Sequence, residues 1–240
     1  MLIQAALNGG RKREEHGAIP VTPQELATSA RDCAAAGAGA LHFHARAADG
    51  RETLAADDVA AAVSAVRAAA PHTPLGVSTG AWIVGGDVGR RKELVARWEV
   101  LPDYASVIFA EEGASELAEL LLSRGIGIEA AFLTPDGVKE FLAGGFASRC
   151  LRVLIEPLEE EIAAALGTVI KIEALLDLGG VKLPRLLHGF NSLAWDVIDA
   201  AAARGYDTRV GFEDVLTLPD GSRAANNAAL IAEATRRAKR

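Results

Sequence analysis

The chain has 240 residues, of which 50% are hydrophobic and 24% are charged, and its formal net charge is −7. A chain of this length and apolar content can bury a full core. It carries no basic stripe with interleaved aromatic residues, which argues against nucleic-acid binding. It has no apolar run of transmembrane length and no signal peptide before its first expected strand, so we expect a cytoplasmic protein. We expect Cys33 and Cys150, which lie far apart, to be free and buried.

Short apolar segments alternate with helical patterns along the whole chain. The expected strands cover residues 3–8, 40–46, 75–80, 104–109, 127–133, 150–155, 185–190 and 208–213. The expected helices lie between the N-cap Thr22 and Gly37, and at residues 55–70, 90–101, 115–124, 135–143, 159–178, 193–204 and 226–240. Strand–helix alternation implies a parallel sheet, and eight units in this length predict one (β/α)8 TIM-barrel domain over residues 1–240. The alternative is a doubly wound open sheet, but residues 8–17 contain no complete G-x-G-x-x-G loop.

Two histidines and a glutamate stand at the ends of expected strands. Active sites of (β/α)8 barrels lie at the carboxyl ends of the strands. His42 and His44 end the second strand and, being two residues apart, point to the same side. Glu213 ends the last strand, and two imidazoles with one carboxylate are a usual catalytic zinc set. We therefore predict a metal site; the competing interpretation is that both histidines only fill the barrel with their nitrogens bonded to neighbours.

Other polar residues at strand ends are ambiguous on their own. Ser78 and Thr79 follow the third strand and could simply form a turn. Arg209 and Glu213 share a strand face, whereas Asp214 faces the other way unless the strand has ended or bulged there. By themselves, Arg209 would be an ion-pair partner and Asp214 a cap.

Further residues near the expected mouth have mostly structural interpretations. Glu129, in the fifth strand, can form a salt bridge inside the barrel. Carboxylates that follow the fourth and sixth strands are expected to be solvated, namely Glu111, Glu112 and Glu156. His188 is expected to be a hydrogen-bonded core histidine. Trp82 either packs over a substrate or anchors its loop.

Four segments resemble the β-keto acid cleavage enzymes. These are AIPVTPQEL (18–26), AGALHFHAR (38–46), VSTG (77–80) and RVGFED (209–214). They occur in the same order as in that family and span most of the chain. The resemblance implies a (β/α)8 barrel with a divalent metal, usually zinc, and a homo-oligomer, expected to be a tetramer.

The resemblance also implies an activity, that of an acyltransferase which cleaves a carbon–carbon bond. Such enzymes combine a β-keto acid with acetyl-CoA and release acetoacetate and a new acyl-CoA by a retro-Claisen route. The metal ligands would be His42, His44 and Glu213.

The remaining roles follow from the same motifs. Asp214 would deprotonate the substrate while Arg209 holds it. Ser78, with Thr79, would hydrogen-bond the substrate carboxylate or the developing oxyanion. Glu129 matches a family glutamate that bonds the variable end of the substrate. Arg11 belongs to a basic loop, residues 11–13, that would attract a carboxylate or CoA phosphates.

The chain departs from the family pattern in three loops. Val215 follows Glu213-Asp214 where the family has asparagine, residues 109–113 lack an Asn-x-Gly element, and Gly10 replaces an acidic residue. One alternative is therefore a metal-containing barrel that binds keto acids without turnover. A metal-dependent hydrolase is the other alternative, although amidohydrolase barrels carry their His-x-His on the first strand.

Overall fold

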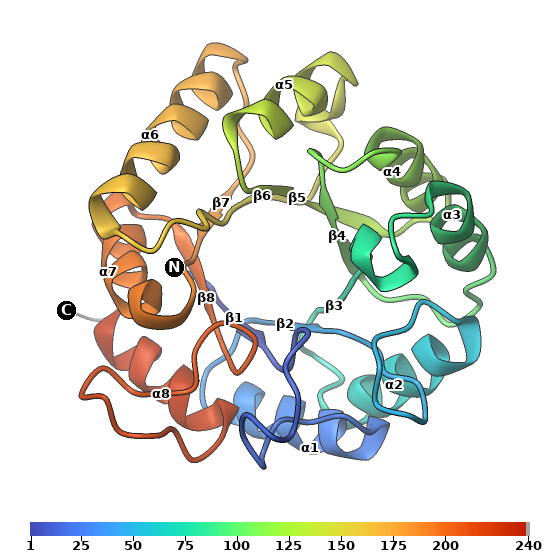
Figure 1. Cartoon of the computed structure of the whole chain (residues 1–240), viewed down its shortest axis with the longest axis vertical. Coiled ribbons are helices and arrows are strands. Elements are labelled where there is room, and N and C mark those ends of the chain that lie inside the picture. Colours follow the sequence, from blue (N-terminus) through green and yellow to red (C-terminus); the bar gives the residue numbers. More distant parts are fainter. Residues whose placement is uncertain (239–240) are drawn as a thin grey trace.

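The protein is a closed barrel of eight parallel strands surrounded by eight α-helices, as the computed structural model of residues 1–238 shows (Figure 1). The strands are β1 (Ile3–Ala6), β2 (Ala40–Phe43), β3 (Leu75–Ser78), β4 (Tyr104–Ile108), β5 (Gly127–Phe132), β6 (Arg152–Ile155), β7 (Arg185–Leu187) and β8 (Asp207–Val210). The helices are α1 (Pro23–Ala35), α2 (Ala56–Ala69), α3 (Val88–Ala96), α4 (Ala114–Ser123), α5 (Pro135–Ala143), α6 (Ile162–Leu178), α7 (Ala194–Arg204) and α8 (Asn227–Arg237). The predicted (β/α)8 barrel is confirmed.

Each strand pairs with the next one in the sequence, and β8 pairs with β1 to close the ring. The register places Ala6 opposite His42, and Gln4 opposite both Ala40 and Arg209. Because all strands run in the same direction, their carboxyl ends meet at one mouth. The loops that carry the predicted site residues therefore converge there.

Three α-helices of the described residues begin at a side-chain cap, namely Thr22 for α1, Asp87 for α3 and Asn226 for α8. Thr22 and Glu25 form the expected capping box of α1, which buries Leu26, Ala30 and Cys33. The predicted helix 90–101 instead begins at Val88, because Asp87 accepts a hydrogen bond from the backbone of Arg90. A 3-10 helix, η1 (Ala81–Val84), was not predicted and follows β3. The predicted last helix, 226–240, is observed as α8, and its final two residues lie outside the described part of the chain.

The apolar core lies between the strands and the helices, whereas the barrel interior is partly polar. Inside the barrel, the Gln4 amide donates to Tyr104 and to Glu129, and the Arg152 guanidinium donates to Glu129. Gly76 makes room for the Tyr104 ring, since a Cβ there would lie 2.1 Å from Tyr104 Cε2. This buried network lies in the barrel interior next to the layer of His42, because Gln4 pairs with Ala40, two residues before His42.

No helix in the described residues 1–238 has both the length and the apolar character required to span a membrane. Cys33 and Cys150 are free and buried, as expected. Burial raises the pKa of each thiol to about 12. Both cysteines are therefore core side chains rather than reactive groups.

Candidate functional site

His42 and His44 lie at the mouth end of β2, one within the strand and one just after it. Their side chains point to the same side, with ring centroids 5.3 Å apart, and they are 1% and 4% exposed. Asn8, which follows β1, fixes the backbone of His44 from both sides. Its Oδ1 accepts from the His44 N–H at 2.8 Å, and its Nδ2 donates to the His44 carbonyl at 2.9 Å.

Glu213 reaches the histidines from the loop after β8. The strand ends at Val210, and Gly211 permits a close turn, since a Cβ there would lie 1.9 Å from the Ala6 carbonyl oxygen. Gly9, with a φ of +53°, leaves the space that the Glu213 side chain occupies, since a Cβ at residue 9 would lie 2.3 Å from Glu213 Cγ. The absence of a Cβ at Gly9 and at Gly211 therefore leaves the space that the Glu213 side chain and its turn require.

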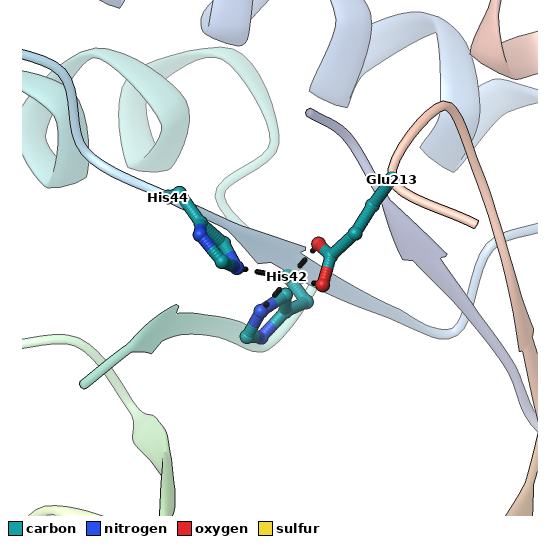
Figure 2. A group of neighbouring side chains, drawn as sticks. All are labelled: His42, His44 and Glu213. Carbon is teal, nitrogen blue, oxygen red and sulfur yellow. Dashed lines mark ion pairs between the residues drawn. The ribbon is translucent and has the colours of Figure 1, made fainter. Parts of the chain in front are cut away.

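The carboxylate of Glu213 points between the two imidazoles (Figure 2). Its Oε2 lies 3.7 Å from His42 Nε2, and its Oε1 lies 3.4 Å from His44 Nε2. One ligand atom from each residue lies within 4.8 Å of the others. Within residues 1–238, Glu213 Oε2 and His42 Nδ1 are buried without a hydrogen-bond partner. Two imidazoles and a carboxylate with an unpaired oxygen can hold a divalent metal ion and leave a position open for a substrate.

Glu52 contacts His44 at Nδ1, the ring nitrogen that does not face Glu213. Its Oε1 lies 2.5 Å from His44 Nδ1, and its carboxylate also accepts from Trp82 Nε1 at 3.2 and 3.3 Å. A carboxylate on the far nitrogen fixes the ring orientation and the tautomer of a metal-binding histidine. Sequence reasoning missed Glu52, although Asp49-Gly50 is a turn signal that could have indicated a hairpin returning the chain to β2.

Asp214 and Arg209 form a buried pair beside Glu213. Arg209 Nη2 donates to Asp214 Oδ1 at 2.7 Å and to Glu213 Oε1 at 2.6 Å. Asp214 is fully buried, and Arg209 is 3% exposed. Because β8 ends at Val210, strand alternation no longer applies at Asp214, so the side chain can turn toward Arg209.

His188 lies on the other side of Asp214. Its Nε2 is 3.2 Å from Glu156 Oε2, and its Nδ1 is 3.6 Å from Asp214 Oδ1. Glu156 is therefore buried rather than solvated, and the expectation for it was wrong. Glu111 also differs from expectation, because it pairs with the buried Arg91 and accepts from the backbone N–H of Ala81.

Burial and neighbouring charges shift the pKa values of these side chains in opposite directions. Burial lowers the pKa of His42 to about 3. At His44 burial acts in the same direction, but the carboxylates of Glu213 and Glu52 prevail and raise its pKa to about 9. Burial raises the pKa of Asp214, although Arg209 and His188 act against this change. Burial disfavours the ionised form of Glu213 as well, yet Arg209 and the histidines hold its pKa well below the ordinary value.

Comparison with known proteins adds a family to this geometry. The family model described as beta-keto acid cleavage enzyme matches residues 1–120 and 177–240, which is more than half of the chain. This chain belongs to the beta-keto acid cleavage enzyme family. A relative from Fusobacterium nucleatum, "3-keto-5-aminohexanoate cleavage enzyme", is 24% identical over 256 residues, which cover 100% of this chain and 91% of the relative.

Solved structures of other proteins share the barrel fold, and at their low sequence identity they indicate nothing beyond the fold. The tryptophan synthase alpha chain from Legionella pneumophila is 13% identical, with a TM-score of 0.63 over 99% of this chain and 91% of that chain. A thiamine phosphate pyrophosphorylase from Pyrococcus furiosus is 11% identical, with a TM-score of 0.58 over 99% and 95%. These similarities concern the fold alone, because one fold supports many different activities.

The other predicted site residues differ in their exposure to solvent and in their hydrogen-bond partners. Ser78 is 5% exposed, and its Oγ lies 3.4 Å from the Gly80 N–H. Thr79 Oγ1 already donates to the Ser106 carbonyl at 2.6 Å. Glu129 is fully buried in the ion pair with Arg152. Arg11 is partly exposed at the mouth.

Arg11 ties the loop after β1 to the loop after β8. It donates to the backbone carbonyl of Glu213 at 3.2 Å, to that of Asp214 at 3.4 Å, and to Asn191 Oδ1 at 2.6 Å. Its guanidinium therefore holds in place the loop that carries both carboxylates.

We expect Glu52→Gln to weaken the binding of a divalent metal ion by about 10–100-fold, because an amide neither orients His44 as firmly nor raises its basicity as a carboxylate does. Equilibrium dialysis against a metal buffer measures this change. Asp49→Asn is the matched control, since Asp49 lies in the same hairpin and, among residues 1–238, its carboxylate accepts hydrogen bonds from Arg51 alone. Equal metal affinity in Glu52→Gln and the wild-type protein would refute the role given to Glu52.

Proposed function

We propose that this chain is a zinc-dependent acyltransferase that reacts a β-keto acid with acetyl-CoA and releases acetoacetate and a new acyl-CoA. One observation carries the proposal: His42, His44 and Glu213 converge on one point while a buried aspartate–arginine pair lies directly beside them. A metal site next to a carboxylate of raised pKa is suited to removing a proton from carbon α to a carbonyl. Membership of the beta-keto acid cleavage enzyme family supports the same chemistry.

In this proposal His42, His44 and Glu213 hold the zinc ion. The donor set fits, because two imidazole nitrogens and one carboxylate leave an open position. A bound metal ion would displace the proton that the carboxylates hold on His44. When bound, the ion supplies Lewis-acid polarisation of the substrate ketone. Glu52 orients His44, and Arg209 holds Glu213 through the contact at Oε1.

Asp214 acts as the base. It takes a proton from the carbon between the ketone and the carboxylate of the β-keto acid, and the freed electron pair forms a bond to the thioester carbon of acetyl-CoA. The carbon–sulfur bond breaks and releases the CoA thiolate. Arg209 orients Asp214, and the raised pKa of Asp214 strengthens it as a proton acceptor.

The second half of the reaction breaks the original carbon–carbon bond. The CoA thiolate adds to the former ketone carbon, and the bond from that carbon to the central carbon breaks. The electron pair left on the central carbon takes the proton back from Asp214, which yields acetoacetate and the new acyl-CoA. Asp214 thus returns to its starting state.

Three further residues receive substrate roles in the proposal, and Thr79 supports one of them. Ser78 donates to the substrate carboxylate or the oxyanion, and Thr79 holds the strand end that presents it. A fixed donor of this kind is worth about 10²–10³ in rate. Glu129 faces the variable end of the substrate from the barrel interior, and Arg11 attracts an anionic group at the mouth. The free, buried cysteines and the use of acetyl-CoA support a cytoplasmic enzyme.

Assembly is the last part of the proposal. We propose a homo-oligomer in which two copies of α6 pack antiparallel about Ala174. Ile170 and Leu178 are 57% and 86% exposed on this helix, four residues before and after Ala174. Across a two-fold axis at Ala174 they would meet each other, and Lys171 would meet Asp177, three residues before and after it. A second interface would extend such a dimer to a tetramer.

Turnover tests the proposed chemistry. The metallated protein should form acetoacetate from acetyl-CoA and a member of a β-keto acid panel. His42→Ala and His44→Ala should lose metal and lower kcat by about 10³-fold or more, since Lewis-acid stabilisation is worth several kcal/mol. Asp214→Asn should keep the metal and lose about 10²–10⁴-fold in kcat. The measurements are metal content by mass spectrometry and acetoacetate release.

The exposed histidine His72 supplies the matched control, and His72→Ala should keep both metal and activity. Full turnover in His42→Ala or His44→Ala would contradict the metal chemistry. Metal binding without turnover on any keto acid would favour a barrel that only binds its ligand.

Light scattering tests the assembly. Ile170→Glu/Leu178→Glu should lower the molar mass in solution, because four glutamates would then meet in an apolar contact. Leu151→Glu, which also changes an exposed leucine, should leave the mass unchanged. An unaltered mass in the double variant would mean that α6 does not form the interface.

A further inference from the structure

A second hollow opens beside the candidate metal centre. It has a volume of about 960 Å³ and lies between the loop after β1, the hairpin after β2 and the 3-10 helix η1. A cavity of this size is within the range of roughly 300–1,000 Å³ that is typical of small-molecule sites. We call it the outer cavity. Its lining includes five cationic side chains, Arg11, Lys12, Arg13, Arg46 and Arg51. It also includes three anionic ones, Glu14, Asp49 and Glu52.

The outer cavity and the metal centre share a wall. Arg11 lines the cavity and donates to the backbone carbonyls of Glu213 and Asp214. Glu52 also lines it and contacts His44 Nδ1. A molecule seated in the cavity would therefore have one end within reach of the residues assigned to the chemistry.

Several cations in the outer cavity can reach a ligand. Lys12 is exposed, and no carboxylate of residues 1–238 forms a salt bridge with its ammonium group. The side chain of Arg51 is 86% exposed, and its one carboxylate partner is the neighbouring Asp49. Arg11 and Arg13 are already paired with Glu15 and Glu25, and Arg46 donates to backbone carbonyls. Lys12 and Arg51 are therefore the two cations of the cavity that are most available to an anionic ligand.

Another part of the cavity lining is suited to an aromatic ligand. Trp82 and Ile83 line the outer cavity, and Trp82 is 50% exposed. The bond from Trp82 Nε1 to Glu52 fixes the indole in place. Stacking of a nucleobase on such a ring is worth about 1–3 kcal/mol. Phosphate-binding cations and a fixed, exposed indole thus face the same hollow.

We propose that the outer cavity binds the nucleotide end of a CoA thioester, with phosphates at Lys12 and Arg51 and the base against Trp82. The inference rests on the proposed function, which requires acetyl-CoA. CoA carries a diphosphate and a 3′-phosphate at one end of a long flexible arm and its thioester at the other. An anion site that borders the reacting centre without belonging to it suits such a molecule. The β-keto acid carries one carboxylate and no nucleobase, so it would make fewer contacts with these cations and none of the stacking on Trp82.

Charge reversal in the outer cavity tests the inference. In the metallated enzyme, Lys12→Glu/Arg51→Glu should raise KM for acetyl-CoA, and Kd for CoA by calorimetry, about tenfold or more, because ionic hydrogen bonds to phosphate are the strong ones. Lys12→Ala/Arg51→Ala should act in the same direction but less strongly. Lys92→Glu/Lys182→Glu changes the net charge equally at exposed positions elsewhere and should leave both constants unchanged.

Truncated donors identify the source of the anion. The KM for S-acetylpantetheine, which lacks the nucleotide, should be the same in the wild-type enzyme and in Lys12→Glu/Arg51→Glu. An equal rise in KM for both donors, or a rise in the KM of the keto acid alone, would overturn the inference.

The two proposals fail separately. Unchanged constants for acetyl-CoA and CoA in an active double variant would refute the outer cavity as the nucleotide site and leave the proposed function standing. Tight binding of CoA that is weakened by the double variant, in a protein without turnover, would support the cavity and refute the function.

Discussion

One guanidinium, that of Arg209, holds two adjacent buried carboxylates at the mouth of the barrel. Its Nη2 lies 2.6 Å from Glu213 Oε1 and 2.7 Å from Asp214 Oδ1. In the metal-free protein, Arg209 and a proton on His44, whose pKa is raised to about 9, face the three carboxylates of Glu213, Asp214 and Glu52. Removing charges from water without compensation is costly. A divalent cation bound to Nε2 of both imidazoles would replace the proton on His44 and offset the charge of these carboxylates.

The barrel supplies this arrangement through the points at which its strands stop. β8 ends at Val210, so the next turn can aim Glu213 toward β2 while Asp214 remains against Arg209. Gly9 and Gly211 lie where a Cβ would collide with Glu213 and with the Ala6 carbonyl. The metal centre, the base and the outer cavity thus depend on the loops after four neighbouring strands, β8, β1, β2 and β3.

Patterns within short segments of the sequence predicted the features that depend on residues close together in the chain. Strand–helix alternation predicted the barrel, and the spacing of His42 and His44 predicted their shared side. The partners supplied by returning loops were not predicted. Glu52 comes back to His44 through a hairpin. Glu156 was expected in solvent because nothing in the chain near it indicates that it meets His188, which lies 32 residues further along. Such pairings depend on tertiary geometry, which a single sequence does not encode in its periodicity.

The central claim is that His42, His44 and Glu213 together bind a metal ion. Anomalous diffraction at the zinc absorption edge, from crystals of the protein grown with zinc, tests this directly. The account predicts one strong peak about 2.0–2.2 Å from His42 Nε2, His44 Nε2 and an oxygen of Glu213. A map without a peak at that point, or with zinc bound only at surface residues such as His72, would contradict it.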